Sequence, residues 1–277
     1  MERMKKHKIP ILLWFAFEAV AVLLWLSLDK AFYFFNFSYI GTAIAVGLAL
    51  YISGYKYARM SVQLAVGLYM LIYLGIINQE NMQIVGFWYY LFSGTFQAAV
   101  IHYLVAKIIG PLLFGRGWCG YACWTAMVLD FLPYKTPQSP RRKGMGLFRI
   151  ITFAISLIYV ILLFSFYHGD MGFIMFISFI VGNFLYYALG ILLAILYKDN
   201  RAFCKYLCPV TVFLKPASYF SLLRIKVDAA SCISCGKCQE ACPMDVDMLN
   251  ISRRRKNGTE CILCFECKKT CPTNAIQ

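Results

Sequence analysis

Six long stretches of apolar residues run along this 277-residue chain. They lie at about residues 10–29, 37–54, 62–79, 84–109, 148–167 and 172–197. A helix needs about 20 residues to cross roughly 30 Å of hydrocarbon, and each stretch comes near that length. The fourth stretch ends at Gly110–Pro111, where we expect the helix to break and continue along the interface. The pattern predicts an α-helical integral membrane protein with about six transmembrane helices.

The charge content agrees with this interpretation. Only 14% of the residues are charged, whereas a soluble domain carries about 25%. The first apolar stretch follows a basic N-terminus, but no small-residue cleavage site comes after it. We therefore interpret this stretch as a membrane anchor and not as a signal peptide.

Basic residues gather in alternate connections between the apolar stretches, and the other connections carry almost none. The basic residues are Lys5, Lys6, Lys8, Lys56, Arg59, Lys135, Arg141, Arg142, Lys143, Arg149, Lys198 and Arg201. Cytoplasmic connections are enriched in Lys and Arg. The chain is thus expected to be a multi-pass protein of the cell (cytoplasmic) membrane, with both termini in the cytoplasm.

After residue 220 the chain becomes polar and rich in cysteine. A segment of this size has too little apolar surface for a large core and usually needs metal or disulfides to fold. We predict three parts: residues 1–200 as the transmembrane domain, 201–221 as a connector with a cysteine pair, and 222–277 as a small cytoplasmic domain.

This C-terminal tail contains the strongest motif. The runs CISCGKCQEACP and CILCFECKKTCP both read Cys-x2-Cys-x2-Cys-x3-Cys-Pro. In such runs three cysteines bind one 4Fe–4S cluster and the fourth binds the other cluster, whereas zinc sites prefer separated cysteine pairs. The predicted ligands are Cys232, Cys235, Cys238 and Cys271 for cluster one, and Cys261, Cys264, Cys267 and Cys242 for cluster two. The tail resembles a bacterial two-cluster ferredoxin, which implies that it is a small α+β domain. Thiolate ligands favour a reducing, cytoplasmic compartment.

The tail departs from acidic bacterial ferredoxins in one respect. Arg253, Arg254, Arg255 and Lys256 form a basic block between its two motifs. Such a block either contacts anionic lipid headgroups, docks an acidic redox partner, or is a solvated loop.

Two further cysteine pairs follow apolar stretches. Arg116-Gly-Trp-Cys119-Gly-Tyr-Ala-Cys123 parallels Arg201-Ala-Phe-Cys204-Lys-Tyr-Leu-Cys208, position for position. Residues four apart share one face of a helix, so the two pairs could together present four thiols to one point. Three interpretations stay open: a third metal or iron–sulfur centre, redox-active dithiols, or packing. The two arginines would offset thiolate charge or anchor at headgroups.

Together these motifs resemble the membrane-bound polyferredoxins over roughly residues 90–277. That family includes the quinol-dehydrogenase iron–sulfur subunit of periplasmic nitrate reduction and related ferredoxins of nitrous-oxide reduction and cytochrome-oxidase assembly. Family members usually have proline after the second cysteine of both membrane motifs. Here Pro209 fits, but Trp124 replaces the first proline.

Four isolated polar residues, Glu18, Gln97, His102 and Lys107, lie in the apolar stretches. Glu18 and His102, the latter with Gln97, are candidates for a quinone or proton site, or for hydrogen bonds between helices. We expect Lys107 to extend to the cytoplasmic interface. The sequence contains no hydrolytic constellation or nucleotide fingerprint, and we expect no nucleic-acid partner.

These patterns predict a membrane-anchored iron–sulfur protein of electron transfer, a subunit of a quinone-linked oxidoreductase. It would relay electrons between a cytoplasmic ferredoxin or flavodoxin-like carrier and quinone or a partner redox subunit, within a larger complex in the lipid membrane. One alternative is an accessory reductase for metalloenzyme maturation, with copper held by the membrane cysteine pairs. A redox sensor is the other alternative.

Overall fold

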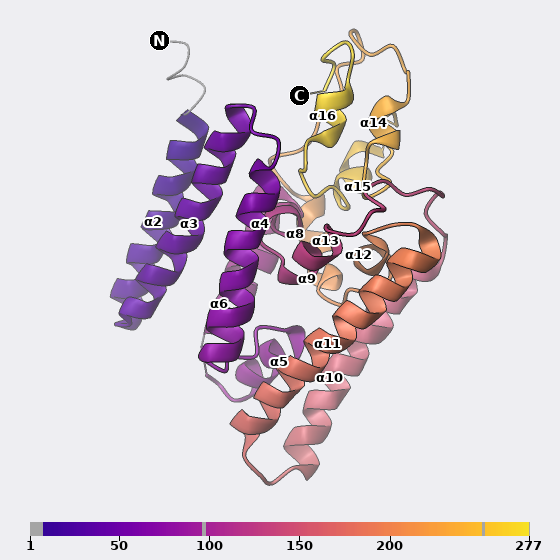
Figure 1. The fold of residues 1–277 in the computed structure, drawn as a ribbon. Coiled ribbons are helices and arrows are strands. Elements are labelled where there is room, and N and C mark those ends of the chain that lie inside the picture. Colours follow the sequence, from indigo (N-terminus) through magenta and orange to yellow (C-terminus); the bar gives the residue numbers. More distant parts are fainter. Residues whose placement is uncertain (1–7, 96–97, 251–252, 277) are drawn as a thin grey trace.

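The computed structural model describes residues 8–95, 98–250 and 253–276. Five helices are long and apolar enough to cross a membrane: Lys8–Leu28, Ala31–Ile52, Ala58–Ile77, Met145–Phe166 and Met171–Tyr197. They correspond to five of the six predicted stretches. The start of the first helix and the C-terminal tail lie at the same end of the molecule (Figure 1).

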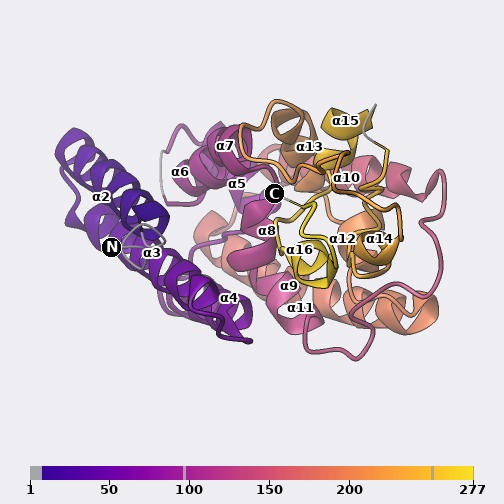
Figure 2. The same cartoon turned by 90° about the horizontal axis from the view of Figure 1, so that it is seen from above.

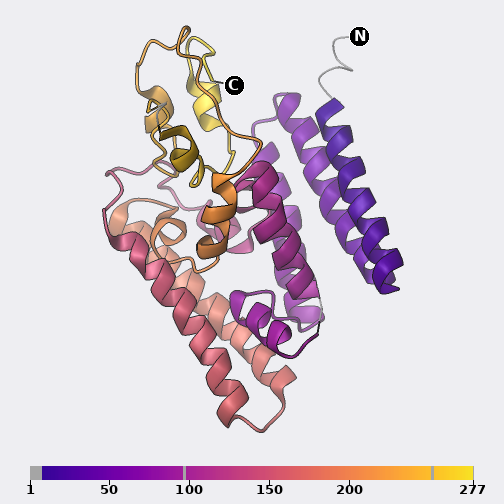
Figure 3. The same ribbon diagram turned by 180° about the vertical axis from the view of Figure 1, so that it is seen from behind.

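The fourth predicted span is wrong as a single helix over 84–109. Helix α5 (Ile84–Phe92) ends at Ser93, and Gly94 follows with a φ of +66°. A second helix then runs through α6 (Ala98–Tyr103), a π-helical turn η2 (Leu104–Ile109) and α7 (Gly110–Phe114). Glycine adopts positive φ without steric cost, so the chain turns there and not at Pro111. Figure 3 shows the two pieces from behind.

The helix does not break at Gly110–Pro111 as expected. It passes through a wider, π-helical turn there and continues as α7. A proline ring clashes with the carbonyl four residues earlier, here that of Lys107. The Gly110 N–H bonds to the Val105 carbonyl, five residues back, which keeps the helix continuous. Such π-helical turns occur frequently at functional sites, and this one carries Lys107.

Helices α2 (Lys8–Leu28) and α3 (Ala31–Ile52) form a hairpin at one side of the molecule, as Figure 2 shows from above. In α2 only Pro10 and Ala21 are buried within the described chain. The bundle core lies between α4 (Ala58–Leu68) with η1 (Tyr69–Ile77), the α5–α7 segment, α10 (Phe148–Phe166) and α11 (Met171–Tyr197). Most of α2 therefore lies at the surface of the described chain.

At the tail-side end of the bundle lie short helices that carry the cysteine pairs and the connector. These are α8 (Gly117–Tyr121), α9 (Trp124–Leu129), η3 (Met145–Leu147), α12 (Ala202–Tyr206) and α13 (Thr211–Tyr219). Trp124, the residue after Cys123, begins α9 and donates a hydrogen bond from Nε1 to Asn183 Oδ1 on α11 at 2.8 Å. This bond connects α9 to α11.

The tail contains the short helices α14 (Lys237–Glu240), α15 (Arg254–Gly258) and α16 (Glu266–Thr270). Within its described residues the β-structure is one isolated antiparallel bridge, Val227 with Ile276. The predicted α+β organisation of the tail is therefore not confirmed in the described residues, which form helical turns and loops joined by this one bridge.

Candidate metal centres

The two cysteine loops of the tail have the same backbone conformation. In the first loop Ser234 and Gly236 have positive φ, and in the second Leu263 and Phe265 do. Asp245 and Asn274 also have positive φ, and each lies three residues after the fourth cysteine of its motif. Alternation between right- and left-handed conformations turns successive N–H groups toward one point and makes an anion-binding concavity found at many Fe–S sites. The backbone thus fits the predicted 4Fe–4S clusters.

The predicted cluster-two cysteines surround one cavity. Cys242, Cys261, Cys264 and Cys267 line it, together with apolar residues such as Ile262 and Met248. The Val246 N–H points at Cys242 Sγ, with N and S 3.4 Å apart. Cys242 belongs to the first motif but lies with the three cysteines of the second. This agrees with the prediction that the fourth cysteine of each motif binds the other cluster.

The predicted cluster-one cysteines lie toward solvent. Cys238 is buried, Cys232 and Cys271 are half-buried, and Cys235 is exposed. All twelve cysteines of the chain fall in the described residues, and none of them forms a disulfide there.

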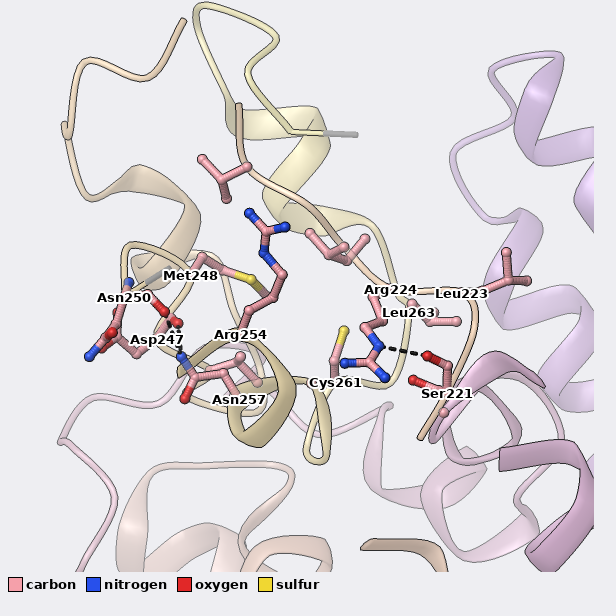
Figure 4. Close-up of a pocket in the computed structure, with 15 residues that line it drawn as sticks. Ser221, Leu223, Arg224, Asp247, Met248, Asn250, Arg254, Asn257, Cys261 and Leu263 are labelled. Carbon is pink, nitrogen blue, oxygen red and sulfur yellow. Dashed lines mark hydrogen bonds between the residues drawn. The ribbon is translucent and has the colours of Figure 1, made fainter. Parts of the chain in front are cut away.

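Figure 4 shows a small pocket beside Cys261, between the connector and the second cysteine loop. Arg224 and Arg254 are among the residues that line it. Arg224 Nε donates to the Ser221 carbonyl at 2.6 Å, which fixes the chain where it enters the tail.

The four membrane cysteines also line a single cavity. Cys119, Cys123, Cys204 and Cys208 share it with Lys107, Arg116 and Gln83, among others. Cys119 and Cys204 pack in one cluster with Cys242 and Cys264 of the tail. The tertiary fold therefore brings both cysteine pairs together, directly beside the cluster-two ligands.

The two pairs repeat each other in structure as well as in sequence. The Ala122 N–H bonds to the Trp118 carbonyl, and the Leu207 N–H bonds to the Phe203 carbonyl, both at 2.9 Å. Helix α8 ends at Tyr121 and α12 at Tyr206, before the second cysteine of each pair. The expectation that each pair shares a helix face is therefore wrong, because the helix stops between the two thiols.

Buried arginines fix these motifs. Arg201 donates to the Cys119 carbonyl at 3.1 Å and to Asp130 at 2.5 Å. Arg149 donates to the Cys204 carbonyl at 3.1 Å. Arg59 also pairs with Asp130, at 2.7 Å. Although burial opposes it, Arg201 and Arg59 hold the pKa of Asp130 below its usual range.

Glu260 connects the tail to the membrane domain. It is the residue before Cys261, and it pairs with Arg116, with Arg149 at 2.9 Å, with Arg141 at 3.1 Å and with Lys215 at 2.9 Å. These cations hold the pKa of Glu260 well below its usual range, against the effect of burial. A charge in this position is a strong anchor, because removal of it would leave several cations uncompensated.

The ion pairs around the cysteines leave an excess of positive charge. Lys205 pairs with Asp199 at 2.9 Å and with Asp245 at 2.7 Å. Five buried cations, Lys107, Arg116, Arg149, Arg201 and Lys205, and the more exposed Arg59, Arg141 and Lys215 face four carboxylates, Asp130, Asp199, Asp245 and Glu260. Buried cations are costly without anions nearby. Thiolates bound to metal would supply that negative charge.

Lys107 does not extend to the interface, contrary to the expectation. It is only 5% exposed, lies with Nζ 5.0 Å from the centre of the Trp118 ring, and lines the cysteine cavity. Among the described residues it forms no ion pair. Arg116 and Arg201 do not anchor at headgroups either. Both are buried: Arg116 pairs with Glu260, and Arg201 pairs with Asp130.

Burial changes the acidity of three of the four membrane thiols. Burial raises the pKa of Cys204 to about 12 and also raises the pKa of Cys123 and Cys208. Reactive cysteines have a lowered pKa. In the described part of the chain, no three His, Cys, Asp or Glu side chains converge as for a single metal ion. In a four-iron cluster each thiolate binds a different iron, so its ligands stand further apart.

Glu18 and His102 are not brought to the cysteines. Glu18 accepts a 2.7 Å hydrogen bond from Ser38 Oγ, between α2 and α3. His102 is buried with its ring 5.0 Å from that of Trp118, and its Nε2 has no partner within the described residues. Gln97, and likewise Lys5 and Lys6 of the basic pattern, lie outside the described residues.

Comparison with known proteins agrees with the cysteine geometry. A family model described as a 4Fe-4S dicluster domain matches residues 224–272, which include all eight tail cysteines. A second model, described as a 4Fe-4S binding domain, matches residues 98–141 and again residues 182–228, each with one membrane cysteine pair. The chain therefore carries 4Fe–4S ferredoxin-type domains.

Two relatives were found among curated proteins. An uncharacterised protein of Methanocaldococcus jannaschii is 25% identical over 177 residues, which is 62% of this chain and 69% of the relative. YccM of Escherichia coli, an electron transport protein by name, is 43% identical over 44 residues, or 16% of this chain and 12% of the relative. No solved structure matches significantly. These findings support iron–sulfur electron transfer.

Sequence reasoning missed Glu260, Asp130 and the position of Lys107. The chain has only 13 acidic residues, and Glu260 stands directly before a cluster ligand. A single acidic residue directly before a cluster ligand, in a chain with an excess of basic residues, is the feature of the sequence that indicates an ion-paired anchor.

Proposed function

We propose that this chain is a membrane-anchored iron–sulfur protein that relays electrons between a cytoplasmic carrier and quinone or a partner redox subunit. When bound, the clusters supply one-electron chemistry at potentials that the protein tunes. The resemblance to polyferredoxins motivates the choice of cytoplasmic carriers, ferredoxin or a flavodoxin-like protein.

One observation carries the proposal: three sets of cysteines lie in series. The cluster-one set faces solvent, the cluster-two set packs against the membrane domain, and the four membrane cysteines lie beside the cluster-two set. Cys238 and Cys271 of the first set pack with Cys267 of the second, and Cys242 and Cys264 of the second pack with Cys119 and Cys204 of the membrane set. This order supports a relay from a soluble carrier to a membrane acceptor.

We further propose that Cys119, Cys123, Cys204 and Cys208 hold a third centre, with an iron–sulfur cluster favoured over copper. Lys107 and Arg116 line the cavity, and the buried Arg201 and Arg149 donate to the carbonyls of Cys119 and Cys204. These cations fit anionic, metal-bound thiolates. Lys107 would stabilise their charge from the bilayer side.

Iron analysis of anaerobically purified protein tests the third centre. The tail alone accounts for about eight iron atoms per chain and a third four-iron cluster raises the total to about twelve. A Cys119→Ser variant should then fall to about eight, while its tail signals in electron paramagnetic resonance stay unchanged. Eight iron atoms in both proteins, with copper lost in the variant, would favour the accessory copper reductase.

The relay itself is tested with reduced ferredoxin and a menaquinone analogue. Oxidation of the reduced tail clusters upon addition of the analogue is expected, through this chain or a co-purified subunit. If the clusters stay reduced in the presence of the analogue and of all co-purified subunits, quinone is not the acceptor.

A further inference from the structure

A groove of about 690 Å³ lies where the tail meets the membrane domain. Its walls come from residues 141–150, from helix α13, and from residues 245–247 and 253–260 of the tail. None of the cysteines lines it. A cavity of this volume is in the range that holds small ligands.

The groove is strongly basic. Seven of its lining residues are cations: Arg141, Arg142, Lys143, Arg149, Lys215, Arg253 and Lys256. Its three carboxylates are already engaged, because Glu260 and Asp245 form the ion pairs described above and Asp247 accepts the N–H groups of Leu249 and Asn250 at 3.2 Å. Among the described residues, Arg142, Lys143, Arg253 and Lys256 have no carboxylate partner. The groove is therefore suited to an added anion.

One wall of the groove continues into the membrane-facing surface. Ile150 lines the groove and is 55% exposed, and its neighbours Leu147, Phe148 and Ile151 are exposed as well. These residues begin the segment Met145–Phe166, which is apolar enough to span a membrane. An anion with an apolar portion would match both surfaces, whereas an acidic soluble protein would leave the apolar wall uncovered.

We propose that this groove binds the phosphate headgroup of an anionic phospholipid, with the acyl chains along the start of α10. Basic pockets at the cytoplasmic side of membrane helices bind such headgroups. The cations come from both sides of the domain junction: Arg142 and Lys143 from the membrane domain, Arg253 and Lys256 from the tail. The lipid phosphate therefore reduces repulsion across the junction and holds the tail against the bundle.

The test is native mass spectrometry of the full chain in detergent, titrated with phosphatidylglycerol, phosphatidylcholine or inorganic phosphate. Phosphatidylglycerol should bind and the other two should not. A double variant Arg253→Gln, Lys256→Gln should weaken binding roughly 30-fold, from two lost headgroup contacts. The control Arg254→Gln, Arg255→Gln removes the same charge from residues of helix α15 that do not line the groove, and should change binding less than about twofold.

Visible absorbance of the tail clusters shows that both variants are folded. Equal weakening in the two double variants would reduce the effect to general surface charge and overturn the site. Equal binding of phosphatidylcholine, or full binding of inorganic phosphate, would overturn the lipid assignment. The lipid assignment would also be overturned if the Arg253→Gln, Lys256→Gln protein bound an acidic ferredoxin more weakly than the wild type does but bound phosphatidylglycerol equally well.

Discussion

The two cysteine loops of the tail share one backbone conformation but face opposite surroundings. Loop one, Cys232–Cys238, is open to solvent, and its Ile233 is 64% exposed. Loop two, Cys261–Cys267, is held by the membrane domain: Tyr121 Oη donates to the Leu263 carbonyl at 2.9 Å, and the Phe265 ring lies 5.6 Å from that of Tyr51. The same ligand spacing therefore occurs in two different environments. Loop one lies toward solvent, and loop two lies against the membrane domain.

The largest effect is expected from Glu260→Gln, which should release loop two from the membrane domain. It leaves Arg116 and Arg149 without their carboxylate, and removal of one partner of a buried ion pair costs about 3–5 kcal/mol. Hydrogen exchange should show loop two becoming as accessible as loop one.

The matched control is Glu266→Gln, whose pair with Lys269 is about 40% exposed. Surface pairs are worth at most about 1 kcal/mol, so exchange in loop two should stay close to the wild-type pattern. Equal exposure of the loop in both variants would mean that Glu260 is not the anchor.

A steric change at the contact with loop two should have the next largest effect. A Cβ on Gly120 would lie 2.4 Å from the Ile262 carbonyl oxygen, so Gly120→Ala must push the loop away. We expect a loss of about 1–3 kcal/mol, measured as a lower temperature for loss of cluster absorbance. Gly146→Ala, where the added Cβ meets nothing within 4 Å, should leave that temperature unchanged.

The charge of Lys107 should distinguish the membrane centre from the tail. In Lys107→Met the potential of a centre at the four membrane cysteines should fall by on the order of 50 mV, because a nearby cation favours the reduced, more negative state. Redox titration followed by electron paramagnetic resonance measures it, and Lys107→Arg should restore most of the shift. A shift in the tail clusters of equal size would contradict the assignment of Lys107 to the membrane site.

The smallest effect is expected in loop one. Gly236 has a φ of +78° with open space around it, so Gly236→Ala should destabilise only through the backbone, by about 1 kcal/mol. Thermal loss of the cluster-one signal should shift by a few degrees at most. A large loss of iron would show that loop one tolerates strain far less than loop two, where Phe265 adopts positive φ.

Much of the local architecture could be read from the sequence because it depends on near neighbours. The five long helices follow from runs of apolar residues, and the two cluster loops follow from Cys-x2-Cys-x2-Cys spacing. The fourth span was misjudged because Gly94 is one residue in an apolar stretch, and its turn depends on how α5 packs. The α+β tail was inferred from resemblance, and its pairing reduces to the Val227–Ile276 bridge.

The sequence by itself determined the membrane helices, the eight tail cysteines and the repeat of two further pairs, because these are properties of short segments. Only the tertiary structure decided that the pairs share one cavity, that Lys107 faces them, and that Glu260 joins the tail to the bundle. Those contacts join residues far apart in the chain, such as Arg116 and Glu260, which are 144 positions apart. Their meeting depends on how the helices pack, which no local pattern encodes.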